Sequence, residues 1–204
     1  MTVDWIIRDK ILLGYISSFK YVDANQLYHL LFYDIKNGKS KAGDRLRSLY
    51  KRGELKRKKV LNRYIYYIGG WSDKWKHHYE LLNYYIRFRK YLKDWQRLDK
   101  YYNEFVISDN LRCDSLFIVT NKVENIQRKY FIEIDRGTNK FDKVKKYNDE
   151  FSSNEWTNKW WADLDGEGKA RFGEVVVVSC RVDEIEKKIK EENRKGLKFS
   201  VIPL

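Results

Sequence analysis

Two acidic residues in the second half of the chain, Glu133 and Asp135, have the spacing of metal ligands. Glu133 lies in a predicted β-strand over residues 130–134, and Asp135 directly follows that strand. Residues two apart in a strand share one face, so the two carboxylates should point the same way. Asp114, at the start of the preceding predicted strand, is placed to join them. Carboxylate oxygens on adjacent strands are the ligands with which many nucleases hold Mg²⁺ to activate water. We therefore predict Asp114, Glu133 and Asp135 as metal-binding and catalytic residues, with Mg²⁺ as the cofactor if the site is catalytic.

The lysine that usually accompanies such carboxylates is displaced. A strand pair that bears Asp and then Glu-x-Lys is the core of restriction-endonuclease-like enzymes, but Asp135 stands at the position of that lysine. A carboxylate cannot neutralise the charge that develops on the phosphate. Lys143 on the following predicted helix is therefore the catalytic candidate, and Lys145 and Lys146 are its alternatives. The competing hypothesis is that the acidic residues only form structural ion pairs with Arg136 and these lysines.

The elements expected around these residues form an α/β domain that spans residues 71–204. A long helix over residues 73–95 connects this domain to the first part of the chain. The uninterrupted apolar run 174–179 is typical of a strand that is buried on both faces. Alternating strands and helices imply a mixed sheet with helices packed on it. The other predicted elements are strands at 116–119, 130–134 and 198–202, and helices at 140–151 and 182–192.

The first 70 residues are expected to form a separate, largely helical domain. Apolar residues recur at helical spacing over residues 5–17, where Asp4 is placed to cap the helix. A second, shorter helix is predicted over residues 24–32, with Asp23 as its N-cap.

A third helix and a hairpin complete the predicted N-terminal domain. Ser40 is the expected N-cap of the third helix, which carries apolar residues, Tyr50 among them, inward and ends at Gly53. Two β-prone runs, 54–61 and 64–68, surround a polar tip and predict a hairpin. Three helices followed by a hairpin is the order of a winged helix-turn-helix. In that fold the third helix enters the major groove and the hairpin, or wing, follows the backbone or the minor groove.

Positive charge is concentrated on the elements that a winged helix presents to DNA. The formal net charge of +13 favours a polyanionic partner. Residues 39–63 hold eleven basic and two acidic residues, a net of +9. Lys41, Asp44, Arg45 and Ser48 recur at three- and four-residue steps, so they share one helix face and are the candidates for base contacts. The remaining predicted DNA-binding residues are Lys39 and the phosphate contacts Lys56, Arg57, Lys58, Lys59, Arg63 and Tyr64.

These motifs together resemble the plasmid replication-relaxation proteins of Gram-positive bacteria and their mobile elements. The resemblance rests on Asp114, on the run Glu-Ile-Asp-Arg-Gly-Thr at 133–138, and on the Lys-x-x-x-Tyr pattern at 143–147. It spans nearly the whole chain, although Cys113 stands where the family commonly has Pro. The resemblance implies an N-terminal winged helix and a role in the replication, nicking or relaxation of a plasmid or phage, or in its control.

The sequence thus favours a protein that binds double-stranded DNA, and two alternatives stay open. The first is a metal-dependent endonuclease or nickase that cuts near the bound site. The second is a dimeric transcription regulator, for which Trp156, Trp160 and Trp161 could supply the apolar surface of a homodimer. A tyrosine nucleophile of the relaxase type also has candidates among the sixteen tyrosines, but no His cluster accompanies it.

Several other classes find no support in the sequence. No apolar run of about 18 residues is present, and the charged start MTVDWIIRDK lacks the apolar segment of a signal peptide. We therefore expect a cytoplasmic protein with no membrane partner. Cys113 and Cys180 are too few for a disulfide scaffold or a zinc cluster. Without a Walker loop, a Rossmann glycine pattern or a Ser-His-Asp arrangement, nucleotide hydrolysis and acyl transfer are unsupported.

Overall fold

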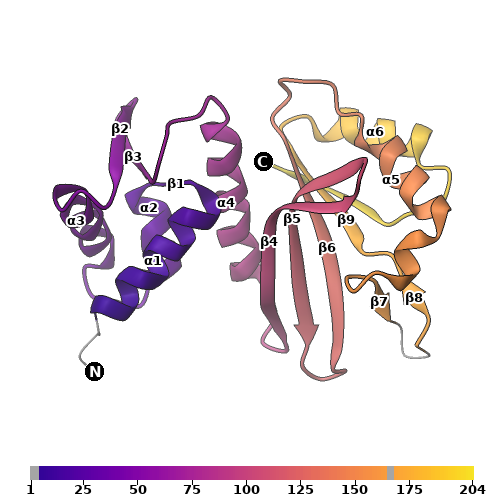
Figure 1. The fold of residues 1–204 in the computed structure, drawn as a ribbon, viewed down its shortest axis with the longest axis horizontal. Coiled ribbons are helices and arrows are strands. Elements are labelled where there is room, and N and C mark those ends of the chain that lie inside the picture. The colour runs from indigo at the N-terminus through magenta and orange to yellow at the C-terminus, as the bar shows by residue number, and fades with distance from the viewer. Residues whose placement is uncertain (1–4, 165–167) are drawn as a thin grey trace. The chain divides into compact units, whose positions relative to one another are not determined.

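The computed structural model describes residues 5–164 and 168–204, and the side chains from Ile7 onward within the first helix. The chain has an α+β fold and divides into two compact units, Met1–Phe88 and Arg89–Leu204 (Figure 1). The boundary expected at residue 70 therefore lies instead at Phe88. The difference arises because the long helix packs on the first unit. Asp4, the expected cap of the first helix, lies outside the described residues.

The first unit contains helices and one small antiparallel sheet. Its strands follow the order β1-β3-β2, so the hairpin β2–β3 is extended by the short strand β1. The long helix α4 is tied to this unit because Gln26 donates a hydrogen bond from Nε2 to the Tyr79 carbonyl oxygen (3.0 Å) and another to Asn83 Oδ1 (2.6 Å). The elements are α1 (Trp5–Phe19), β1 (Tyr21–Val22), α2 (Ala24–Leu27), a π-helical turn (Tyr28–Phe32), α3 (Gly38–Lys51), β2 (Lys56–Val60), β3 (Arg63–Tyr67) and α4 (Trp75–Tyr91).

The predicted cap of the second helix is confirmed. Asp23 accepts a hydrogen bond from the Gln26 backbone N–H, and the Gln26 side chain accepts one from the Asp23 N–H, which makes a complete capping box. The core of the unit includes fully buried apolar side chains of α1, α2, α3 and α4, among them Leu12, Leu27, Leu46 and Leu82. These contacts fix α3 against the two helices that precede it.

Helix α3 begins three residues earlier than the sequence suggests. Asn37, in the left-handed region (φ 59°), precedes its first residue Gly38, so the expected cap Ser40 lies inside the helix. A Cβ atom at position 38 would collide with the carbonyl oxygen of Phe32, and only glycine fits so close to that backbone. Tyr50 was expected to point inward, but it is 38% exposed.

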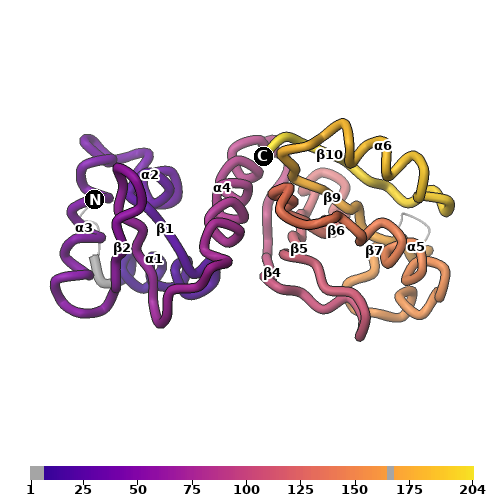
Figure 2. The backbone as a smooth tube through the Cα atoms, turned by 90° about the horizontal axis from the view of Figure 1, so that it is seen from above, coloured from indigo at the N-terminus to yellow at the C-terminus, as the bar shows by residue number. Residues whose placement is uncertain are grey.

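The second unit is built on a five-stranded mixed sheet in the order β10-β9-β6-β5-β4. Strands β4, β5 and β6 form an antiparallel meander, and β9 and β10 then add in parallel to β6. Helices α5 and α6 lie on the same side of this sheet in two views (Figures 1 and 2). The elements are β4 (Gln96–Ser108), β5 (Leu111–Asn121), β6 (Ile126–Asp135), α5 (Lys143–Ser153), a 3-10 turn (Glu155–Asn158), β7 (Asp163–Leu164), β8 (Ala170–Arg171), β9 (Glu174–Ser179), α6 (Val182–Glu192) and β10 (Phe199–Pro203).

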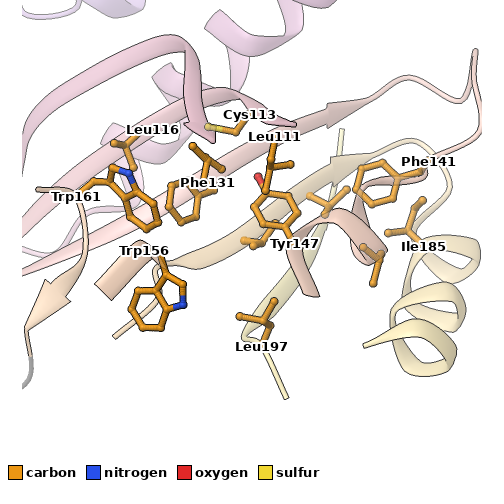
Figure 3. Close-up of a cluster of buried hydrophobic side chains, with 14 of the residues drawn as sticks. Leu111, Cys113, Leu116, Phe131, Phe141, Tyr147, Trp156, Trp161, Ile185 and Leu197 are labelled. Carbon is orange, nitrogen blue, oxygen red and sulfur yellow. The ribbon is translucent and has the colours of Figure 1, made fainter. Parts of the chain in front are cut away.

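The core of the second unit lies between the sheet and the two helices. Phe131 on β6 packs against the ring of Trp161, with centroids 5.3 Å apart, and against that of Tyr147 on α5 (6.1 Å) (Figure 3). Val177 on β9 and Ile185 on α6 are fully buried in the same cluster. The predicted strand 174–179 and helix 182–192 agree with β9 and α6 residue for residue.

Strand β4 is an element that the sequence prediction missed. Its residues alternate between half-buried and exposed along an edge of the sheet, and charged residues interrupt its apolar pattern. In the part of the chain that the structure describes, no helix combines the length and the apolar character needed to cross a bilayer.

Candidate functional site

The four predicted base-contact residues of α3 lie together on one side of the helix. Lys41, Asp44, Arg45 and Ser48 line a single surface hollow. Lys41 and Asp44 are exposed, whereas Arg45 and Ser48 are half-buried. The face that helical spacing predicted is therefore present, but its members differ in how far they reach into solvent.

Arg45 is held by an ion pair with Asp9 on α1. Its guanidinium binds both carboxylate oxygens of Asp9, and Arg52 adds a hydrogen bond from Nη2 at 3.1 Å. Burial favours the neutral acid, but the hydrogen bonds from Arg45 and Arg52 outweigh it and lower the pKa of Asp9. Only 19% of the Arg45 side chain is exposed. Arg45 thus connects α3 to α1, and Asp44 similarly binds the neighbouring Arg47.

Arg57 on β2 connects the hairpin to α3. Its guanidinium carbon lies 4.2 Å from the ring centroid of Tyr50 and 4.3 Å from that of Tyr64. A hydrogen bond with the Tyr66 side chain raises the pKa of Arg57 further. A guanidinium between two aromatic faces is stabilised by cation–π attraction. The exposure of Tyr50, which the sequence did not predict, is explained by this contact.

Arg63, the first residue of β3 after the hairpin turn, belongs to a polar network. Its Nη1 donates to the Tyr79 hydroxyl (2.8 Å) and to Asp23 Oδ2 (3.3 Å), and Tyr79 donates to the same Asp23 oxygen (2.7 Å). Burial, and then the Asp23 carboxylate, raise the pKa of Tyr79. The network links the hairpin to the cap of α2 and to helix α4, so Arg63 has a structural role there.

The lysines of the predicted interface remain exposed to solvent. Lys56 donates from Nζ to the Gly69 carbonyl oxygen (2.9 Å), and Lys58 lies 4.5 Å from the ring centroid of Trp71. Within residues 5–164 and 168–204, the side chains of Lys39, Lys41 and Lys59 make no hydrogen bond, ion pair or ring contact. These three ammonium groups, on α3 and β2, are thus available to an outside anion.

The second candidate site brings Asp114, Glu133 and Lys143 together. Asp114 and Glu133 lie on neighbouring strands, one position beyond the last paired residues of β5 and β6. Lys143 is the first residue of α5, and its Nζ lies 2.5 Å from Glu133 Oε2 and 4.0 Å from Asp114 Oδ1. The Tyr147 hydroxyl, one helical turn further along α5, donates to Glu133 Oε1 (2.8 Å). The sequence placed Tyr147 in a motif but not in this site.

Glu133 is buried, and burial disfavours its charged form. Its side chain is 2% exposed, and burial, together with the nearby Asp114 carboxylate, raises the pKa of Glu133 to about 8. The ammonium of Lys143 opposes this shift. Burial disfavours the charge of Lys143 in turn, but the two acidic residues outweigh it and raise the pKa of Lys143. The lysine therefore keeps its positive charge.

Asp135 is separated from this group by its own partners, which differs from the expected convergence of three carboxylates. Its Oδ2 accepts hydrogen bonds from Arg181 Nε (2.9 Å) and Ser179 Oγ (2.7 Å), and its Oδ1 accepts from Arg181 Nη2 (3.1 Å) and the Gly137 N–H (3.1 Å). These bonds outweigh burial and lower the pKa of Asp135. Arg181 follows strand β9, and no sequence motif linked it to Asp135.

The described residues contain no group of three or more His, Cys, Asp or Glu side chains placed to hold a metal ion. The predicted ligand set Asp114, Glu133 and Asp135 is accordingly not assembled. Both acidic residues of β6 form ion pairs, as the alternative hypothesis of structural ion pairs expects. Glu133 pairs with Lys143 and Asp135 pairs with Arg181, and neither pair involves Arg136.

Two of the three tryptophans suggested for a dimer surface lie in the core. Trp156 and Trp161 are 4% and 2% exposed, whereas Trp160 is 62% exposed and packs edge-on against Tyr102 and Phe105. Trp156 and Trp161 therefore cannot contact a second chain in this fold. Comparisons with models of known protein families, with curated proteins and with solved structures found no match.

Proposed function

We propose that this protein binds double-stranded DNA through its first unit, which acts as a winged helix-turn-helix. The observation that carries the proposal is the set of three exposed, unengaged lysines, Lys39, Lys41 and Lys59, on α3 and β2. These two elements correspond to the recognition helix and the wing of such a domain. Phosphate neutralisation by lysine supplies the sequence-independent part of DNA affinity.

The arginines of the same elements support the proposal in a different way. Arg45, Arg57 and Arg63 connect α3 and the hairpin to α1, to each other and to the cap of α2. We assign them as positioning residues that hold helix and wing in a fixed relation. A preformed interface loses less conformational entropy when it binds.

Features of the second unit support a function of this protein in a mobile genetic element. In this unit three antiparallel strands are followed by helix α5, by the short strands β7 and β8, and then by the parallel strand β9. With Asp114, the run 133–138 and the pattern 143–147, it supports the resemblance to plasmid replication-relaxation proteins. We propose a role in the replication or relaxation of a plasmid or phage, or in its control, without DNA cleavage by this unit.

A salt-series binding titration of the full chain on a labelled duplex tests the proposal. The expected result is binding whose logarithmic association constant falls linearly with the logarithm of salt concentration. The same samples, with Mg²⁺ added and run on a denaturing gel, are expected to show intact strands. Weak binding that is insensitive to salt would overturn the proposal, and Mg²⁺-dependent nicks would favour the nickase alternative.

A further inference from the structure

The ammonium group of Lys143 lies in a cage of oxygen atoms. Besides Glu133 Oε2 at 2.5 Å and Asp114 Oδ1 at 4.0 Å, the Arg112 carbonyl oxygen accepts a hydrogen bond from Nζ at 2.9 Å. Two carboxylates and a backbone carbonyl are the kind of ligands that hard cations such as Mg²⁺ or Mn²⁺ take in proteins. Lys143 thus provides a positive charge where such an ion would be bound.

The other oxygens of the two carboxylates are already engaged. Glu133 Oε1 accepts from the Tyr147 hydroxyl (2.8 Å), and Asp114 Oδ2 accepts from the Ile134 N–H (2.7 Å). Each carboxylate therefore turns one oxygen toward the lysine and is fixed through the other.

Helix α5 directs the side chain of Lys143 toward Glu133. Lys143 and Tyr147 are four residues apart on α5, so both face Glu133, whereas Lys146 pairs with Asp142 on another side of the helix. A divalent cation beside Glu133 would lie within a few ångströms of the ammonium in a buried environment. Like charges at that separation repel strongly where the effective dielectric constant is low. The ammonium group already occupies the position between Glu133 Oε2 and the Arg112 carbonyl oxygen, so a divalent ion bound to these oxygens would have to displace it.

We infer that Lys143 is the resident cation of the centre formed by Asp114 and Glu133, and that this unit functions without a divalent metal ion there. This inference goes beyond the proposed DNA binding and does not depend on it. It gives the centre a defined role, since the lysine binds Glu133 and the Arg112 carbonyl oxygen and so anchors the first turn of α5 to strands β5 and β6.

Titration of the full chain with Mn²⁺, followed by electron paramagnetic resonance of the free ion, tests this inference. The wild type is expected to show no stoichiometric Mn²⁺ site, and its weak binding should be the same in Asp114→Asn. Lys143→Ala removes the charge and opens space, so it is expected to gain one Mn²⁺ per chain with at least about tenfold tighter binding. Lys143→Met is the matched control, because it removes the charge but fills the space and should gain no site.

Two outcomes would overturn the inference. One is a wild-type site for one Mn²⁺ that is lost in Asp114→Asn, because the lysine would then not exclude the metal. The other is a folded Lys143→Ala variant that binds no more Mn²⁺ than the wild type, because the lysine would then not occupy a cation's place. Circular dichroism establishes whether Lys143→Ala is folded. If it is not folded, the comparison of Mn²⁺ binding between the wild type and Asp114→Asn decides the question.

Discussion

Replacing the three exposed lysines Lys39, Lys41 and Lys59 with alanine is predicted to weaken DNA binding without harming the fold. The ammonium groups have no partner within the described residues, so their removal breaks no contact. Alanine is also the best helix former, which suits the two positions on α3. The effect should therefore appear in binding and not in the unfolding transition.

The expected size of this effect follows from counterion release. Each phosphate contact contributes about 0.9 to the slope of log K against log salt, so three lost contacts reduce the slope by about 2.7. At about 0.1 M salt the same relation gives a loss of about 500-fold in affinity. The loss should shrink toward about 80-fold at about 0.2 M salt, because the released counterions gain less entropy there.

Fluorescence anisotropy on a labelled duplex at several salt concentrations measures both quantities. The matched control replaces three exposed lysines of α5 and α6, Lys145, Lys187 and Lys190, and changes the net charge equally. If both triple variants lose the same affinity and slope, the overall charge attracts DNA and the assignment of α3 and β2 as the interface is refuted.

Three further predictions concern stability. Asp9→Asn is expected to destabilise the first unit by about 1–3 kcal/mol in urea unfolding, a range discounted for partial exposure of its arginine partners. Because the pKa of Asp9 is lowered in the fold, its contribution to the free energy of unfolding is present above about pH 4 and is lost as pH falls further. If the stability of the wild type and that of Asp9→Asn fall in parallel as the pH is lowered, this reasoning is contradicted. The pKa of Glu133 is raised to about 8, so the wild type should lose stability relative to Glu133→Gln as pH rises from about 5 to about 8; a constant difference would disprove it. Gly38→Ala should cost about 1–3 kcal/mol because its methyl group collides with the Phe32 carbonyl oxygen, and an unchanged melting temperature would show that the helix start can shift.

Elements with a strong local signal could be predicted from the sequence. The apolar run of β9, the cap of α2, the apolar stripe of α6 and the polar tip of the hairpin each encode their structure within a few residues. Strand β4 could not be found this way, because an edge strand is half-exposed and its mixed polar pattern matches neither periodicity. The start of α3 was also missed, because it depends on a backbone contact of Gly38 that no sequence pattern reports.

In the candidate sites, too, the sequence predicted what depends on local spacing but not what depends on contacts between distant residues. The sequence selected Glu133 by its spacing along β6 and named Lys143 as the lysine candidate with Lys145 and Lys146 as alternatives, and the structure places Glu133 and Lys143 in contact. It could not predict that Asp135 binds Arg181, since Asp135 ends β6, Arg181 follows β9, and these two strands meet only in the sheet. Likewise, helical spacing identified the exposed face of α3, but the partner of Arg45 lies on α1, 36 residues away.

Hydrogen–deuterium exchange of the full chain, with and without a duplex, tests the central claim most directly. If the first unit binds DNA as proposed, amides of α3 and of the hairpin β2–β3 should exchange more slowly in the complex, while those of β5, β6 and β9 should not change. Protection confined to the second unit, or no protection at saturating duplex, would contradict the claim.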